Sequence, residues 1–99
     1  MNESPLLIHV WDVDPAEATA AEGRLGEMFG ELLKDPGFVS ARVLESADRT
    51  SMAALVEMRS VEDRQRLERL PEVREVFDHL DGTANIVMRL YHEGATYHA

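Results

Sequence analysis

The chain has no cysteine, few basic residues and no long apolar run. Zero Cys among 99 residues rules out a disulfide framework and a thiolate site, and fits a reducing compartment. No stretch approaches the roughly 20 apolar residues of a membrane span, and no charged-then-apolar leader opens the sequence. Lys and Arg total 10 against 19 Asp and Glu, a net charge of -9, which phosphate backbones repel. We therefore expect a cytoplasmic protein that binds neither membranes nor nucleic acid.

The sequence does contain enough hydrophobic material for one folded domain. Hydrophobic residues make up 44% of the chain, which argues against disorder. A chain of this length buries roughly two-thirds of its unfolded surface, so its core is adequate but not generous. We expect residues 1–99 to form a single domain, with subunit pairing as a natural supplement to its stability.

Strand and helix patterns alternate along the chain. Asp14 and Pro15 suit a helix start, Ser60 resembles a second cap, and Pro71 forces a break between two helical stretches. We predict strands over residues 5–13, 38–46, 52–59 and 84–92, helices over 15–34, 60–70 and 71–80, and a loose tail over 94–99. This βαββαβ order predicts a ferredoxin-like α+β fold, an antiparallel sheet with helices on one face.

Each predicted strand has one cleanly apolar face and one mixed face, because side chains alternate along a strand. We expect the helices to cover the apolar faces, which in the first strand carry Leu6, Ile8 and Val10. The mixed faces would then share the other side of the sheet, with Leu7, His9, Trp11, Phe38, Ser40, Arg42, Leu44, Leu55, Glu57, Arg59, Asn85, Val87, Arg89 and Tyr91. About half of this set is too hydrophobic for water, so we expect a homodimer through the sheet faces.

Two helical features have simple interpretations. Gly23, Gly26 and Gly30 recur at three- and four-residue spacing in the first helix. They either allow a backbone to approach closely or are merely tolerated, at a cost of roughly 1 kcal/mol each relative to alanine. The charged run over residues 62–69 is typical of a solvated helix face with internal ion pairs.

Three segments resemble the antibiotic biosynthesis monooxygenase domain: residues 8–15 (IHVWDVDP), 35–44 (DPGFVSARVL) and 56–60 (VEMRS). The resemblance extends from about residue 6 to residue 91. The Pro36-Gly37-Phe38 turn and the Arg59-Ser60 junction are its most specific parts, and they identify the fold better than the chemistry. The resemblance implies a dimeric α+β barrel, with a cleft between helices and sheet or inside the barrel of each subunit.

The antibiotic biosynthesis monooxygenase family includes cofactor-independent oxygenases of aromatic polyketide pathways, haem-degrading enzymes and quinol monooxygenases. Many members carry a tryptophan in the helix after the third strand and a histidine before the following proline. Residues 64–71 (RQRLERLP) contain neither, so a haem-degrading role is set aside. The resemblance then implies a small monooxygenase that uses molecular oxygen, without metal, flavin or other cofactor, to oxidise a polyketide-like anthrone or hydroquinone to a quinone.

Such a reaction requires a base, a group that stabilises an oxyanion, and a dry pocket. His9 is the candidate base, since imidazole titrates near neutral pH. Arg89 matches an arginine that the oxygenases place at the substrate, and is the candidate partner of the oxyanion. Substrate binding, by stacking or hydrogen bonding, is expected of Trp11, Phe38, Asn85 and Tyr91.

Other interpretations of these residues stay open. His9 could be a core histidine satisfied by a neighbour such as Glu57, and Arg89 could form an interface ion pair with the same carboxylate. Trp11 could be structural. The whole pocket could serve a cyclase or isomerase, or the chain could be a non-catalytic dimeric binding protein. The four histidines show no metal-ligand spacing, so no metal site is expected.

Overall fold

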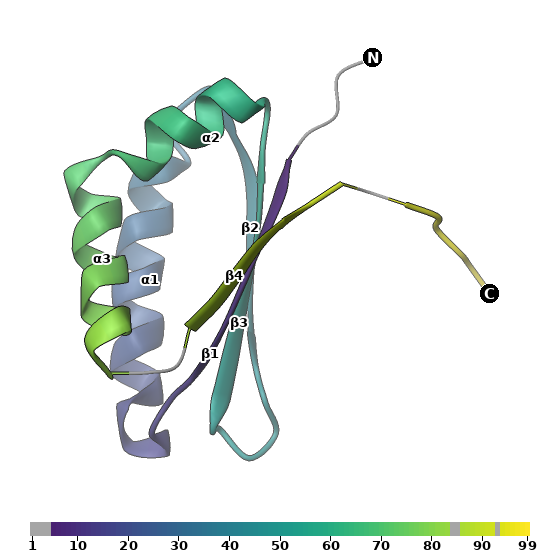
Figure 1. The fold of residues 1–99 in the computed structure, drawn as a ribbon. Helices are drawn as coiled ribbons and strands as arrows, with labels where there is room; N and C mark the ends of the chain where they lie inside the picture. The colour runs from purple at the N-terminus through teal and green to yellow at the C-terminus, as the bar shows by residue number, and fades with distance from the viewer. Residues whose placement is uncertain (1–4, 84–85, 93) are drawn as a thin grey trace.

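The computed structural model describes residues 5–83, 86–92 and 94–99. Its elements are β1 (Leu6–Asp12), η1 (Pro15–Glu17), α1 (Ala18–Leu32), β2 (Phe38–Glu45), β3 (Ser51–Met58), α2 (Val61–Glu68), α3 (Pro71–Thr83) and β4 (Ile86–Tyr91). The four strands form one antiparallel sheet in the order β2-β3-β1-β4, and the three α-helices lie together on one side of it (Figure 1). The predicted ferredoxin-like α+β fold is confirmed. Within the described ranges, no helix combines the length and apolar character needed to cross a bilayer.

Local signals in the sequence set where the helices begin. Asp14 Oδ1 accepts a hydrogen bond from Ala16 N at 2.9 Å, with Pro15 in the first helical position. Ser60 Oγ accepts from Asp63 N at 3.1 Å and starts α2 in the same way. Side-chain caps of this kind satisfy backbone donors that a helix start leaves free.

Helix α1 packs on the sheet through one face and leaves its glycines in open space. Its buried side chains are Ala18, Ala21, Leu25, Met28, Phe29 and Leu32. A Cβ atom added at Gly23, Gly26 or Gly30 would meet nothing within 4 Å. The close-approach interpretation of these glycines is therefore wrong, and they are simply tolerated.

The expected orientation of β1 is wrong. Leu7, His9 and Trp11 lie beneath the helices with only 5%, 2% and 1% of their surface exposed, whereas Val10 on the other face is 43% exposed. Both faces of this strand are largely apolar, so its pattern did not define an inward face. Pairing decides it, because Trp11 lies opposite Met52 on the strictly apolar face of β3, and turning the large indole inward removes the most apolar surface from water.

Phe38 also lies beneath the helices, contrary to expectation. Phe38 pairs with Met58 but Ser40 pairs with Glu57, so Val39 is an extra residue that forms a β-bulge. The bulge changes the alternation of side chains, and both Phe38 and the later Ala41 face the helices. The ring of Phe38 packs against Phe29 with centroids 6.1 Å apart.

The side of the sheet away from the helices is uncovered in this single chain (Figure 1). It carries Val10, Leu44, Val87 and Tyr91, which are 43–54% exposed. The partly buried Leu6, Ile8 and Leu55 lie between them. We call this surface the open face, and it is apolar enough to require explanation.

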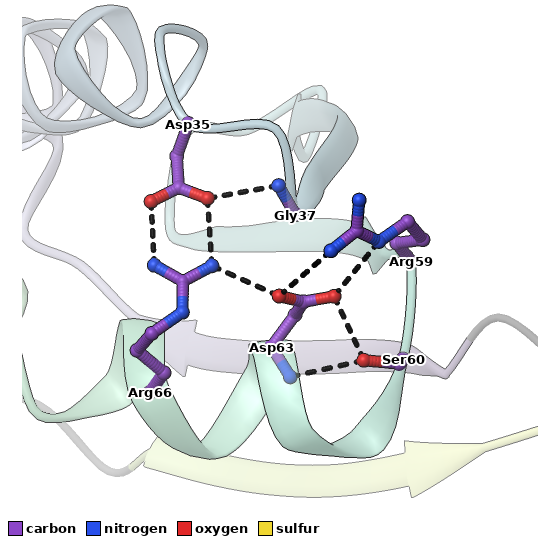
Figure 2. Close-up of polar contacts among 6 residues, drawn as sticks. All are labelled: Asp35, Gly37, Arg59, Ser60, Asp63 and Arg66. Carbon is purple, nitrogen blue, oxygen red and sulfur yellow. Dashed lines mark hydrogen bonds and ion pairs between the residues drawn. The ribbon is translucent and has the colours of Figure 1, made fainter.

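A network of charged hydrogen bonds joins the α1–β2 turn to the start of α2 (Figure 2). Arg66 donates to both carboxylate oxygens of Asp35, at 2.6 and 2.8 Å, and to Asp63 Oδ1 at 2.9 Å. Asp63, with 7% of its surface exposed, also accepts from Arg59 Nε at 3.1 Å and from Ser60 Oγ at 2.7 Å. These donors hold the pKa of the Asp63 carboxyl below its ordinary value, with Arg66 as the largest cause.

Gly37 lies in close contact with this network where it meets the turn. A Cβ atom at this position would lie 2.5 Å from the carboxyl carbon of Asp63 and 2.8 Å from Arg66 Nη2. The backbone of Gly37 instead donates to Asp35 Oδ1 at 2.8 Å and accepts from Arg59 N, also at 2.8 Å. The segments that carry the family resemblance, around Gly37 and Arg59-Ser60, therefore meet in one structural cluster.

Candidate active site

A cavity of about 260 Å³ lies between the sheet and α3. Strands β1 and β4 form its floor, and α3 with the end of α2 forms its wall. The lining side chains are Leu7, His9, Glu68, Val73, Arg74, Phe77, Asp78 and Met88. We call this space the outer cavity. It lies between helices and sheet, which is one of the two places that the resemblance implied.

His9 is the polar group at the base of the outer cavity. It is 2% exposed, and its Nε2 atom has no hydrogen-bond partner among the described residues. Phe77 meets the imidazole edge to face, with ring centroids 4.6 Å apart and an interplanar angle of 67°. Glu57 pairs with Leu6 and lies on the opposite face of the sheet, so the alternative in which Glu57 satisfies this histidine is wrong.

Burial controls the charge of His9. Desolvation lowers the pKa of its imidazole from 6.5 to about 4, because a buried base disfavours its charged form. The ring is therefore neutral at neutral pH. A buried polar atom without a partner is costly, and His9 lines the outer cavity, where a ligand hydroxyl or carbonyl would approach its ring.

Charged side chains surround the mouth of the outer cavity. Glu68 accepts two hydrogen bonds from Arg64 Nη1, at 3.0 and 3.1 Å. This is one of the internal ion pairs predicted for the charged run over residues 62–69. Arg74 and Asp78 extend from α3. Sequence analysis did not select Arg74, Phe77 or Asp78. In the sequence, these residues stand out only by their position in or beside the apolar stripe of α3. That position does not distinguish residues that line a cavity from residues on the protein surface.

A second, smaller pocket continues inward from the outer cavity. It has a volume of about 30 Å³ and shares Leu7, His9, Glu68, Val73 and Phe77 with the outer cavity. We call it the inner pocket. The side chains that line it but not the outer cavity are all buried and apolar: Met28, Phe29, Leu32, Phe38, Val56, Met58 and Leu67.

The structure separates the residues that sequence analysis had grouped in one site. His9 pairs with Met88 and Ile8 pairs with Arg89, so His9 faces the helices while Arg89 faces the other way. Tyr91 lies on the open face with Arg89. The expected joint action of His9 and Arg89 within one subunit is wrong, because adjacent residues of a strand project to opposite faces.

The remaining candidates have different positions. Trp11 is in the core, lines neither cavity, and its Nε1 atom has no hydrogen-bond partner among the described residues. Phe38 lines the inner pocket. Asn85 lies outside the described residues. Within the part of the chain that the structure covers, no group of three or more potential ligands could hold a metal ion.

Comparison with known proteins identifies structures but no sequence relatives. No family model matches the sequence, and no curated protein matches it. A conserved protein of unknown function from Bacteroides thetaiotaomicron superimposes with a TM-score of 0.83 at 15% identity, over 94% of this chain and 100% of that one. SnoaB, a cofactor-independent oxygenase from Streptomyces nogalater, superimposes with a TM-score of 0.77 at 18% identity, over 95% and 96% of the two chains.

A third structure gives the same result. A candidate antibiotic biosynthesis monooxygenase from Deinococcus radiodurans has a TM-score of 0.80 at 12% identity, over 96% of this chain and 97% of that one. At such identities the likeness establishes the fold. The resemblance to the antibiotic biosynthesis monooxygenase domain is thus confirmed as a likeness of fold over nearly the whole chain.

Proposed function

We propose that the chain is a small cofactor-independent oxygenase that oxidises an aromatic substrate in the outer cavity. The observation that carries this proposal is that His9, a buried histidine whose Nε2 atom has no partner among the described residues, lines a cavity of about 260 Å³. The fold is the one found in SnoaB, a protein named as a cofactor-independent oxygenase. An anthrone or a hydroquinone-like phenol is the substrate class proposed.

The chemistry balances without a reductant. A deprotonated anthrone gives one electron to dioxygen, and the resulting carbon radical and superoxide combine to form a peroxide on the ring carbon. Loss of the remaining hydrogen from that carbon as a proton breaks the O–O bond and leaves a carbonyl. One oxygen atom stays in the quinone and the other leaves as water, so the substrate supplies all four electrons.

His9 takes the first proton in this scheme. Its neutral imidazole accepts the hydrogen of the phenol or of the enol form of an anthrone. A pKa of about 4 makes the free imidazole a weak base, but an imidazolium facing a new phenolate in an apolar cavity is stabilised by that charge. Arg74 lines the same cavity, and we assign to it the oxyanion role that sequence analysis gave to Arg89.

The test is oxygen-dependent turnover of anthrone- and hydroquinone-type substrates, followed by quinone absorbance and oxygen consumption. We expect His9→Gln to lower kcat by about 100-fold or more, the scale of a lost general base. The exposed His92 offers a matched control, and His92→Gln should leave turnover unchanged. No oxygen-dependent product above background from folded protein would overturn the proposal, and equal turnover without oxygen would point to a cyclase or isomerase.

We also propose that two copies pair through their open faces. Val10, Leu44, Val87 and Tyr91 form an exposed apolar surface on one side of the sheet, and two such surfaces would cover each other. Val87→Asp should shift the protein to monomer in sedimentation velocity. Val61, 43% exposed on α2, provides the control, because Val61→Asp leaves the sheet unchanged. A monomeric unaltered protein would contradict pairing.

A further inference from the structure

We propose that the inner pocket is the site that holds dioxygen beside the bound aromatic substrate. This inference rests on the proposed oxygenase function and adds a location for its second substrate. The pocket measures about 30 Å³, whereas a single water requires roughly 10–15 Å³. It is therefore large enough for a small diatomic molecule and much smaller than the outer cavity.

The lining of the inner pocket favours an apolar guest over water. A buried water typically makes about three hydrogen bonds. The seven side chains that line this pocket but not the outer cavity offer none, since all of them are apolar. The polar residues at its boundary are His9 and Glu68, and Glu68 already accepts two hydrogen bonds from Arg64. Enclosed apolar cavities stay dry and take up apolar guests such as xenon, and the apolar part of this lining offers a guest the same surroundings.

The position of the inner pocket suits the reaction. Five lining residues are common to the inner pocket and the outer cavity, including His9 and Phe77. A substrate hydrogen-bonded to His9 would therefore have the inner pocket at its side. Dioxygen held there would be close to the ring carbon when His9 removes the proton, and the two reactants would not have to meet by diffusion.

The direct test uses dissolved dioxygen, which is paramagnetic, as its own NMR probe on the unaltered protein. Met58 and Met52 form a matched pair, because both are buried on the same face of β3 and only Met58 lines the inner pocket. Replacing nitrogen by oxygen should broaden the Met58 methyl signal selectively. Equal broadening of the two methyls, or none, overturns the proposal.

A kinetic test asks whether the bound oxygen is used. Val56 lines only the inner pocket, and Val56→Ile adds one methylene to that space. We expect the KM for oxygen to rise about tenfold, the scale of one methylene in an apolar pocket, with the KM for the aromatic substrate unchanged. Val13 packs on the core but lines neither space, so Val13→Ile is the control and should change neither constant.

The outcomes separate this inference from the proposed function. Selective broadening of the Met58 methyl signal without turnover of any aromatic substrate would contradict the oxygenase proposal but support the oxygen site. Turnover without selective broadening would support the oxygenase proposal but contradict the oxygen site. An equal rise of both KM values in Val56→Ile would mean that the substitution distorts the outer cavity, and would overturn the assignment of the inner pocket.

Discussion

Two buried polar groups, one at the start of α2 and one on β1, differ in how their hydrogen-bonding capacity is satisfied. Asp63 accepts hydrogen bonds from Arg59, Ser60 and Arg66, whereas Nε2 of His9 has no partner among the described residues. A satisfied buried network fixes local structure, and an unsatisfied group lowers stability until a ligand pairs with it. The hydrogen bonds of Asp63 therefore stabilise the fold, whereas His9 keeps an unsatisfied group that a ligand could pair with.

Lowering the pH should produce the largest change in the free energy of unfolding, and His9 and the network of Asp63 should respond in different pH ranges. Burial lowers the pKa of His9 from 6.5 to about 4. At pH values between these two, the His9 imidazole is therefore protonated in the unfolded chain and neutral in the folded protein. Stability is therefore lost as the pH falls from 6.5 to about 4, by about 3 kcal/mol at about 1.4 kcal/mol per pH unit. Urea unfolding near pH 7 and near pH 4.5 measures this loss.

The carboxylates of the network respond in a different pH window. Arg66 lowers the pKa of Asp35 from 3.8 to about 2. This stabilisation is present above pH 3.8 and is lost as the pH falls towards 2. His9→Leu should abolish the loss above about pH 4 and leave the one below it. Unchanged acid sensitivity in that variant would show that His9 is not its source.

Gly37→Ala should produce the next largest effect, confined to the network. The new methyl group would overlap the Asp63 carboxyl, and overpacking of this kind typically costs about 1–3 kcal/mol. Gly26→Ala is the matched control in the middle of α1, where a methyl group meets nothing and should stabilise by up to about 1 kcal/mol. The two melting temperatures should move in opposite directions. A stabilised Gly37→Ala would show that Asp63 moves aside freely.

His9→Leu should give the smallest change in stability, although it should remove activity. Replacing a buried, unpartnered imidazole by an apolar side chain of similar size should be neutral or should stabilise the protein by about 1 kcal/mol near pH 7. Aromatic turnover should be lost at the same time. Destabilisation of about 2 kcal/mol or more would mean that the imidazole makes a hydrogen bond in the folded protein, and the comparison would fail.

The fold was more predictable from the sequence than the orientation of its strands. Caps at Asp14 and Ser60 and the break at Pro71 are local signals, and they led to the correct fold class. β3 alternates cleanly, and its inward face at Met52 through Met58 follows from the pattern. β1 is apolar on both faces, so its orientation depends on pairing across the sheet, which no local pattern contains.

The candidate site was predictable only in part. His9 was selected as the candidate base because imidazole titrates near neutral pH, and it does line the outer cavity. Its supposed partner Arg89 was chosen on the assumption that both lie on one face, and the register places them on opposite faces. Arg74 and Phe77 are brought to His9 by the packing of α3 against the sheet, and that juxtaposition depends on tertiary structure.

The extra residue at Val39 affects how this chain is compared with others of the same architecture. A relative that lacks the bulge would have one residue fewer before the rest of β2. An ungapped alignment would then match each later residue of β2 with a neighbour that points to the opposite side of the sheet. Roles transferred along β2 from distant structures therefore need superposed coordinates and not residue counting.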